Sequence, residues 1–529
     1  MKSITVGIVR LQEMYNIIML KVLHKHLPLA ILLIGIFFYC LYFSLFTINR
    51  FDKLQAHYFD LGIMDQTVHN TYMGIKTFDL SRILELTDPA AGTSQVKRMA
   101  VHNDIILAFL APFYFIHDGS ATLLVMQTFV LALGAYYVFL IGKNIFNKHK
   151  FRDWIALIFA YGYLLYPPLQ KANNFDFHAV TFATTLLLMM FYYFSQKKYR
   201  LSILLAFLAA MTKEQVGLTV ASFGGYVILN EFIVNYFNKK DKLLKKLKEK
   251  KILFAIILVV MGLVWVLLSM KVIIPFSRSG PHFGAEYYEY LKTDPLKGLH
   301  ALFRYESAKY LSIILTPFGF LSLLAPLRFL IMIPELLVIL LSTNSNMRNI
   351  YFHYESVLTP FIVITSMYGG RNFLNANLIE KLKRLVPKKF RHYIFFSTSF
   401  FLIIYVILSA LSASMYMSPL PWGHHSDLYP WQKADIKLQD VRLWKSYLRD
   451  DSVAVSTTGH LAPHFTDRRY FYNFAGGYDK ASYVIIDTYE LGRGFQGREK
   501  KEEYDKLVRD WRYVNIYKQH GIEVYKNVY

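Results

Sequence analysis

The stretch PLAILLIGIFFYCLYFSLFT, residues 28–47, consists almost entirely of apolar side chains and carries no charge. A helix of roughly 20 such residues is long enough to cross the hydrocarbon core of a bilayer. Comparable apolar runs recur at residues 120–142, 252–275 and 393–417. Over all 529 residues, 54% are hydrophobic and only 18% are charged, and the apolar residues are bunched instead of alternating with charges. The sequence therefore predicts an all-α polytopic membrane protein.

Residues 1–27, which precede the first run, contain basic residues such as Lys2 and Arg10. No small-residue cleavage site follows the run, so we expect it to remain in the protein as a first helix. The single cysteine, Cys40, lies inside this helix. One cysteine allows neither an internal disulfide nor a cysteine zinc site, and we interpret Cys40 as a small buried hydrophobic residue.

The formal net charge of +22 is distributed unevenly along the chain. Lysine and arginine accumulate in cytoplasmic loops of membrane proteins, so short basic segments between apolar runs indicate orientation. No groove-reading motif accompanies the charge, and we expect no nucleic-acid partner. The four basic segments are residues 143–152, 196–200, 238–251 and 371–392.

Placing these four segments in the cytoplasm predicts about 11 transmembrane helices and a cytoplasmic N-terminus. The expected domains are a cytoplasmic segment 1–27, a transmembrane domain 28–418 with a first outer loop 50–119, and an extracytoplasmic α/β domain 419–529. The predicted spans are residues 28–49, 120–142, 154–168, 178–194, 201–212, 217–231, 252–275, 310–324, 329–342, 357–370 and 393–417.

Two segments decide this topology. Residues 104–117, DIILAFLAPFYFIH, are short and contain Pro112. A crossing there would invert every later basic loop, so we expect an interfacial helix. Residues 201–231 could form one helix, but that helix would bury Lys213 and Glu214 at mid-membrane and place the most basic loop outside. We therefore expect two short spans that meet at TKEQ on the outer side.

The sequence from about residue 419 onward has charges of both signs. The runs SVAVS, YFYNF, SYVIID and IEVYKN are typical of short strands, and REKKEEYDKLVRDW is typical of a helix, which predicts a small α/β domain. His460 and His464 are spaced as metal ligands on a helix could be, but Pro463 breaks the helix and no third ligand is evident. We interpret both as surface histidines.

Six polar clusters next to apolar runs fall on the outer side of the predicted membrane domain. Ionisable groups at a membrane are costly and usually line a cavity or a substrate path, so their convergence predicts a functional site there. The clusters are HYFDLGIMDQTVH (57–69), RMAVHND (98–104), NNFDFH (173–178), TKEQ (212–215), SRSGPHF (277–283) and RNIYFHYE (348–355).

The acidic candidates each have a structural alternative. Asp65 could be a solvated residue of an interfacial helix, whereas the place of Asp60 near the end of the first helix favours a function. Asp176 and His178 follow the Pro-Pro pair at 167–168 and could cap the next helix instead of acting on a substrate. Deprotonated carboxylates at these positions could serve as a general base toward a hydroxyl.

The basic candidates could bind an anionic leaving group. Lys213, Arg278, Arg348 and His353 offer the charges and donors that a phosphate requires. Lys213 could equally form a satisfied ion pair with Glu214, and His353 could be structural. A lipid-linked phosphate would reach such a site sideways from the bilayer. The sequence contains no P-loop and no GxGxxG motif, so nucleotide-driven chemistry is not supported.

Several of these motifs resemble a known family. FDLGIMDQ (59–66), HND (102–104), YPPLQKANNFDFHA (166–179) and MTKEQVGL (211–218) are together similar to a family of predicted prokaryotic membrane proteins with a domain of unknown function. That family is grouped with the GT-C glycosyltransferases, and the resemblance covers residues 28–370. It implies a GT-C-like fold.

The resemblance also implies roles by position. The first catalytic acid of GT-C enzymes, in the first outer loop, matches Asp60, a second acid matches Asp176, and the segment 104–117 matches an interfacial helix. Such enzymes take a sugar from a polyprenyl-phosphate carrier and pass it to a lipid, glycan or protein acceptor. A D-x-D pair is absent at Asp60, so a divalent metal is compatible with the site but not required.

We therefore predict a membrane glycosyltransferase, an inverting hexosyl- or pentosyltransferase of the bacterial plasma membrane. Its partners would be a polyprenyl-phosphate-linked sugar donor, a cell-envelope acceptor and membrane lipids. Asp60 would be the general base, and Asp176 with His102 would position the acceptor or a metal. A transporter or flippase of an anionic solute and a non-catalytic envelope assembly factor are the alternatives. The candidate substrate-binding residues are Asp65, His102, Asp104, His178, Lys213, Glu214, Arg278, Arg348 and His353.

Overall fold

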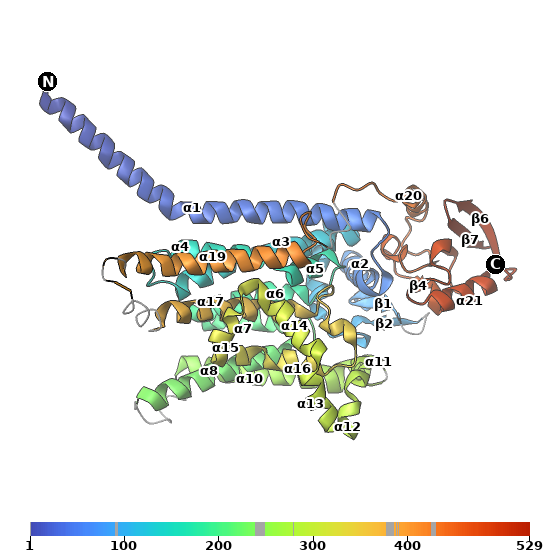
Figure 1. Cartoon of the computed structure of the whole chain (residues 1–529). Helices are drawn as coiled ribbons and strands as arrows, with labels where there is room; N and C mark the ends of the chain where they lie inside the picture. The colour runs from blue at the N-terminus through green and yellow to red at the C-terminus, as the bar shows by residue number, and fades with distance from the viewer. Residues whose placement is uncertain are drawn as a thin grey trace.

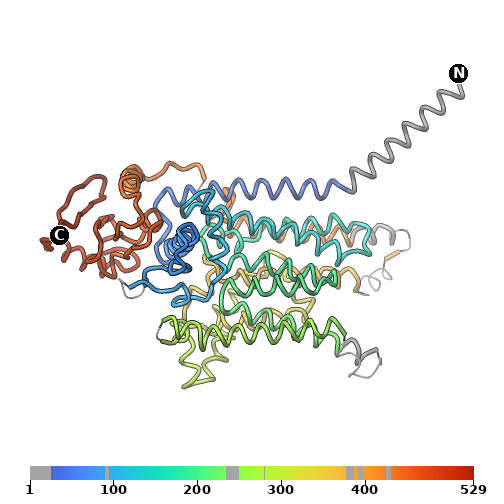
Figure 2. The backbone as a smooth tube through the Cα atoms, turned by 180° about the vertical axis from the view of Figure 1, so that it is seen from behind, coloured from blue at the N-terminus to red at the C-terminus, as the bar shows by residue number. Residues whose placement is uncertain are grey.

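Long helices lie side by side along one direction, and the C-terminal strands lie at one end of this bundle (Figure 1). The view from behind gives the same arrangement (Figure 2). Residues 239–248 and 377–385, which belong to two of the basic segments, lie outside the described residues. The computed structural model describes residues 2–89, 94–238, 249–278, 280–376, 386–387, 389, 391–424 and 430–529.

Within the described residues, five helical segments are long and apolar enough to cross a membrane. They coincide with five of the predicted spans and confirm a helical membrane protein. The segments are His26–Asp52 in α1 (Lys2–Asp52), Ser120–Ile145 (α3), Val216–Ile233 in α8 (Val216–Asn238), Lys250–Arg278 from α10 (Lys250–Leu268) through α11 (Ile274–Arg278), and Thr398–Met417 in α19 (Arg391–Met417).

The other predicted spans correspond to shorter helices. The segment 310–324 is interrupted where Pro317 lacks an amide donor and where Gly319 and Phe320 adopt positive φ angles of 57° and 56°. Helix length therefore identifies five spans and leaves the total of 11 a prediction. The shorter helices are α4 (Arg152–Leu164), α5 (Pro167–Asn174), α6 (Thr181–Ser195), α7 (Tyr199–Ala210), α14 (Tyr305–Leu315), α15 (Pro326–Phe329), α16 (Ile333–Leu341) and α17 (Thr359–Asn375).

Small residues allow α8 and α10 to touch at their backbones. A Cβ atom added at Gly262 would lie 2.3 Å from the carbonyl oxygen of Gly217, and one added at Gly224 would lie 2.5 Å from the carbonyl oxygen of Ala255. Membrane helices associate closely where small residues face each other. The α7–α8 turn, predicted at TKEQ, is also present, because α7 ends at Ala210 and α8 begins at Val216.

The loop after α1 folds into short elements instead of a further long helix. A single π-helical turn, η1 (Tyr58–Gly62), leads directly into α2 (Ile63–Thr77). A two-stranded antiparallel sheet, β1 (Glu85–Thr87) and β2 (Gln95–Lys97), follows. The segment expected to be interfacial forms the 3₁₀ helix η4 (Ile105–Phe115), which packs against α2.

The chain from residue 430 to 529, here called the C-terminal α/β region, contains a mixed five-stranded sheet in the order β4-β3-β5-β7-β6. The four predicted strands and the predicted helix are present. Strand β6 was not predicted, because most of its side chains are exposed and give no apolar alternation. The elements are α20 (Lys437–Tyr447), β3 (Val455–Thr457), β4 (Phe471–Asn473), β5 (Tyr483–Asp487), α21 (Gly497–Leu507), β6 (Tyr513–Gln519) and β7 (Ile522–Asn527).

The C-terminal α/β region packs on the loop that follows α1. The rings of Tyr58 and Phe471 lie 5.2 Å apart within a shared apolar cluster. Arg469 Nε donates to the Glu85 carboxylate at 3.0 Å, which ties the region to strand β1. The contact joins segments that lie far apart in the sequence, so it fixes the loop against the sheet.

His464 corrects one interpretation made from the sequence. It is buried, with 4% of its surface exposed, and its ring stacks on Phe51 with the ring centroids 3.9 Å apart. Phe51, at the end of α1, covers it, and a contact between such distant residues leaves no signal in a local pattern. The surface interpretation was therefore wrong for His464, whereas 42% of the His460 side chain is exposed.

Candidate functional site

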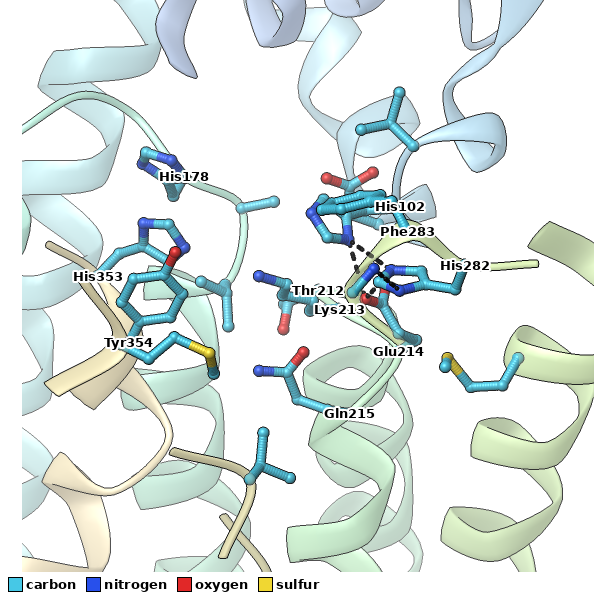
Figure 3. A pocket seen from close by; sticks show the side chains of 18 of the residues that line it. His102, His178, Thr212, Lys213, Glu214, Gln215, His282, Phe283, His353 and Tyr354 are labelled. Carbon is cyan, nitrogen blue, oxygen red and sulfur yellow. Dashed lines mark hydrogen bonds and ion pairs between the residues drawn. The ribbon is translucent and has the colours of Figure 1, made fainter. Parts of the chain in front are cut away.

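A cavity of about 410 Å³ lies where the loops at the α/β end of the helical bundle meet. Five of the six polar clusters contribute to its lining through Asp60, His102, His178, His282 and His353, and the TKEQ turn completes the set. Figure 3 shows the four histidines and the TKEQ side chains converging from separate elements. Part of the lining is apolar: Ile63, Met64, Val180, Leu218, Val266 and Met270.

Asp60 faces the cavity from the π-helical turn η1. Its Oδ1 atom lies 3.1 Å from Nε2 of His178, a residue between α5 and α6. Nδ1 of His178 lies 3.1 Å from the carbonyl oxygen of Asp176, to which it can only donate. The contact of Nε2 with the Asp60 carboxylate holds the two side chains together at the cavity surface.

The electrostatic surroundings of Asp60 favour its charged form. Burial acts to raise the pKa of the Asp60 carboxyl, but the hydrogen bond and charge of His178, with the charge of Arg50, hold this pKa below its usual value. The side chain is 29% exposed, so a substrate can reach it. Asp60 is therefore a deprotonated carboxylate at neutral pH.

His353 forms the wall behind His178. The two rings stack with their centroids 3.7 Å apart. Burial lowers the pKa of His353 well below its usual value, and the neighbouring His178 lowers it further. His353 is therefore a neutral ring at the cavity surface and supplies no positive charge at neutral pH.

Asp176 lies beside the cavity and does not line it. Its carboxylate is fully buried, forms an ion pair with Arg50 and accepts the backbone N–H of His57 at 3.0 Å. Burial raises the pKa of Asp176, while Arg50 opposes the rise. Through Arg50 and the His57 amide, Asp176 holds the segment that leads into Asp60.

His102, Glu214 and His282 form a second polar group in the cavity (Figure 3). Oε1 of Glu214 lies 2.9 Å from Nδ1 of His102 and 3.3 Å from Nε2 of His282. Burial lowers the pKa of His102 to about 4, and although burial acts to raise the pKa of Glu214, the two histidines hold it well below its usual value. The group thus combines two imidazoles with a carboxylate.

The ligand atoms of this group lie close enough together to hold a metal ion. Two imidazoles and a carboxylate are a donor set that suits Zn²⁺. The backbone N–H of Gly284 donates to Nδ1 of His282 at 2.9 Å, so the other ring nitrogen carries the proton that faces Glu214. A metal at that nitrogen would require the ring proton to move to Nδ1, at the cost of the hydrogen bond from Gly284.

Two cations line the cavity. Arg98 is fully buried and forms a bidentate pair with Asp104, with Nε–Oδ1 and Nη2–Oδ2 distances of 2.8 Å. Nη1 of Arg98 has no hydrogen-bond partner among the described residues. Lys213 points toward Tyr354, with Nζ 5.8 Å from the ring centroid, and forms no ion pair within the described part of the chain.

Three predicted site residues lie elsewhere. Asp65 is buried and accepts hydrogen bonds from Tyr114 and Thr466, both at 2.7 Å. Arg348 donates to the carbonyl oxygens of Ile339 and Ser342 at 3.3 and 2.7 Å. Arg278 lies over the Phe283 ring at 5.7 Å. None of the three lines the cavity.

Sequence reasoning did not select Arg98, His282 or Tyr354 as site residues, although all three line the cavity. Each lies in one of the polar clusters that the sequence did reveal. What distinguishes these three residues from their sequence neighbours is a contact with a distant part of the chain, such as the contact of His282 with Glu214. A single sequence does not reveal such contacts.

The chain resembles solved structures and one protein family. The chain is similar in structure to ArnT from Cupriavidus metallidurans, determined with bound undecaprenyl phosphate, with a TM-score of 0.48, 9% identity, and coverage of 95% of this chain and 97% of that chain. It is also similar to the oligosaccharyltransferase AglB from Archaeoglobus fulgidus, in complex with an inhibitory peptide and a dolichol-phosphate, with a TM-score of 0.41, 11% identity, and coverage of 88% and 70%. No curated protein matches the chain. The model of the DUF2079 family of predicted membrane proteins matches residues 50–524, which confirms the resemblance in the motifs, and the chain belongs to this family.

Proposed function

We propose that this protein is a membrane glycosyltransferase that moves a sugar from a polyprenyl-phosphate carrier to an acceptor hydroxyl. The observation that carries the proposal is the Asp60 carboxylate, held by His178 and facing a partly apolar cavity of about 410 Å³. Lys213 lines the same cavity. A base and a cation in one cavity fit a reaction between a hydroxyl and a lipid-linked phosphate. The match in position of Asp60 and Asp176 to the acids of GT-C enzymes, which the family resemblance implies, supports the same reaction.

In the proposed step, Asp60 accepts the proton of the acceptor hydroxyl while the hydroxyl oxygen attacks the anomeric carbon. The glycosidic bond forms as the bond between the anomeric carbon and the phosphate oxygen breaks, and the bonding electrons leave with the phosphate. Lys213 balances the charge of the leaving phosphate. Attack from the side opposite the phosphate inverts the configuration of a hexosyl or pentosyl group.

The other candidate residues take supporting roles in this proposal. Asp176 positions the turn that carries Asp60, through its contacts with Arg50 and the His57 amide. His353 and His178 form one wall of the cavity. A divalent metal held by His102, Glu214 and His282 would supply a Lewis acid for the phosphate oxygens.

We further propose the topology that the basic segments predict. It has 11 spans, a cytoplasmic segment 1–27, a transmembrane domain 28–418 and an extracytoplasmic α/β domain 419–529 in a bacterial plasma membrane. This orientation places the cavity at the extracytoplasmic surface, where a polyprenyl-phosphate sugar and a cell-envelope acceptor can meet. The positive-inside distribution of lysine and arginine supports it.

The test compares purified wild-type protein with the Asp60→Asn variant. Each is mixed with labelled polyprenyl-phosphate sugars and an extract of acceptor lipids, and freed polyprenyl phosphate is measured. Loss of a general base lowers such rates by about 10²- to 10⁴-fold. The matched control is Asp52→Asn, because Asp52 makes only a solvent-accessible ion pair with Arg442 at 3.2 Å. This control should keep the wild-type rate.

The outcomes separate the candidate functions. Release by the wild type and by Asp52→Asn, but not by Asp60→Asn, supports the glycosyltransferase and its base together. Wild-type release by a folded Asp60→Asn variant would overturn the role of Asp60. If no variant frees polyprenyl phosphate, while the protein moves the intact lipid-linked donor across the membrane of proteoliposomes, the protein is a transporter.

A further inference from the structure

A second group of metal-compatible side chains lies outside the cavity, between the C-terminal α/β region and the loop after α1. The group consists of His57, His460 and Glu490, whose ligand atoms lie within 4.8 Å of one another. His57 immediately precedes η1, whereas His460 follows β3 and Glu490 ends the short helix η15 (Thr488–Glu490). The three ligands thus come from three separate segments on the two sides of one contact.

The His57 ring has a free ligand atom. Its Nε2 atom is buried and has no hydrogen-bond partner among the described residues. Its Nδ1 atom accepts a long hydrogen bond, 3.4 Å, from the backbone N–H of Phe59, so a metal at Nε2 would shift the ring proton to Nδ1 and release only this weak contact. A buried polar atom without a partner costs free energy, so its presence calls for a ligand. Burial also lowers the pKa of His57 to about 4, which leaves the ring in the neutral form that binds metals.

The backbone beside His57 is shaped to admit this ring. A Cβ atom added at Gly459 would lie 2.3 Å from Nε2 of His57, so any side chain at this position would displace the ring. The carbonyl oxygen of Gly459 accepts the backbone N–H of Tyr58 at 3.0 Å, which fixes the two segments at this distance. The glycine therefore lets His57 approach His460, whose ring centroid lies 5.0 Å away.

Glu490 supplies the carboxylate. It is buried, and its Oε2 atom lies 3.3 Å from Nδ1 of His460, while its Oε1 atom accepts the His460 backbone N–H at 3.0 Å. The buried ammonium group of Lys500 contacts Oε2 as well. A divalent cation at this position would compete with Lys500, because both neutralise the same carboxylate.

We propose that His57, His460 and Glu490 bind a divalent cation, with Zn²⁺ as the best fit, and that this ion fastens the C-terminal α/β region to the segment carrying Asp60. Two imidazole nitrogens and one carboxylate oxygen form a three-ligand zinc set whose fourth position is open to water. Because His57 lies only three residues before Asp60, the ion sets the position of the candidate base. Metal binding can be measured without a sugar donor, so the proposal stands apart from the reaction proposed above.

The experiment measures Zn²⁺ binding to the full-length protein in detergent after removal of metals with a chelator. His102→Gln serves as the background, because it disables the cavity group that could take a second ion. In this background we expect one bound Zn²⁺ per chain. Adding His460→Gln should raise the dissociation constant for Zn²⁺ by more than about 100-fold. Residues that only hydrogen-bond to metal ligands already change metal affinity about 10- to 100-fold, and His460 is itself a ligand in this proposal. Adding His117→Gln, an exposed histidine, should change nothing.

Lys500→Met provides the second variant. It removes the competing ammonium group and should tighten Zn²⁺ binding in the same background. Misfolding would weaken Zn²⁺ binding, so tighter binding cannot be explained by it. Zn²⁺ should also slow hydrogen exchange of the segment 55–62, and this protection should disappear in His460→Gln. Equal Zn²⁺ affinities in the background, His460→Gln and Lys500→Met proteins, or no binding to the background, would overturn the proposal.

Discussion

Asp60 and His178 set the pH range in which the candidate base is deprotonated. Although burial acts to raise the pKa of Asp60, His178 holds it below its usual value, so His178→Gln should raise it. Only deprotonated Asp60 accepts a proton, so activity is present above this pKa and lost as the pH falls through it. The acid limb of the kcat/KM profile should therefore move to higher pH in the variant. A lower rate with an unmoved acid limb would mean that His178 acts only through packing.

Arg50 and Asp176 form a buried ion pair whose energetic role can be measured separately from catalysis. Their side chains are 10% and 1% exposed. Arg50→Met leaves the Asp176 carboxylate without its partner, and breaking a buried pair in this way costs about 3–5 kcal/mol. We expect a marked fall in the temperature of thermal unfolding in detergent. Adding Asp176→Asn removes the unpaired charge and should restore part of the loss; no recovery would contradict this explanation.

At the level of secondary-structure elements, the contact between α8 and α10 depends on glycine. Gly262→Ala would place a methyl group 2.3 Å from the Gly217 carbonyl oxygen, and such overpacking costs about 1–3 kcal/mol. Gly225, also in α8, has open space at its Cβ position, so Gly225→Ala should stabilise the helix by about 0.5–1 kcal/mol. The unfolding temperatures of the two variants in detergent, each compared with that of the wild type, test these two expectations. Equal effects would show that the helices do not depend on this contact.

The orientation of the whole molecule can be tested with single cysteines. Cys40, the single cysteine, is buried, so Cys40→Ala provides a background for new labelling sites. Lys148→Cys lies in a predicted cytoplasmic loop, and Ser452→Cys lies in the C-terminal α/β region; both positions are exposed. A thiol reagent that cannot cross membranes should label only Ser452→Cys in intact cells and both variants after lysis. The reverse pattern would invert the proposed topology.

At the scale of the whole molecule, some features can be predicted from the sequence and others cannot. Apolar runs predicted the long helices and the β-rich runs predicted four strands, because both patterns are local. The polar clusters predicted most of the cavity lining for the same reason. The burial of Asp176 by Arg50, the stacking of His464 on Phe51 and the pairing of His282 with Glu214 join distant segments. No local pattern encodes such contacts, so these roles needed the structure.

The glycine contact between α8 and α10 also has a mechanical consequence for the cavity. Leu218 in α8 and Val266 in α10 both line the cavity, close to the point where the backbones of Gly217 and Gly262 touch. Close backbone packing at that point restrains the two helices from separating, so this part of the cavity wall is held in place. His353 and Tyr354, which also line the cavity, belong to a short connection between helices. The cavity would therefore widen more readily by displacement of that connection than by separation of α8 and α10.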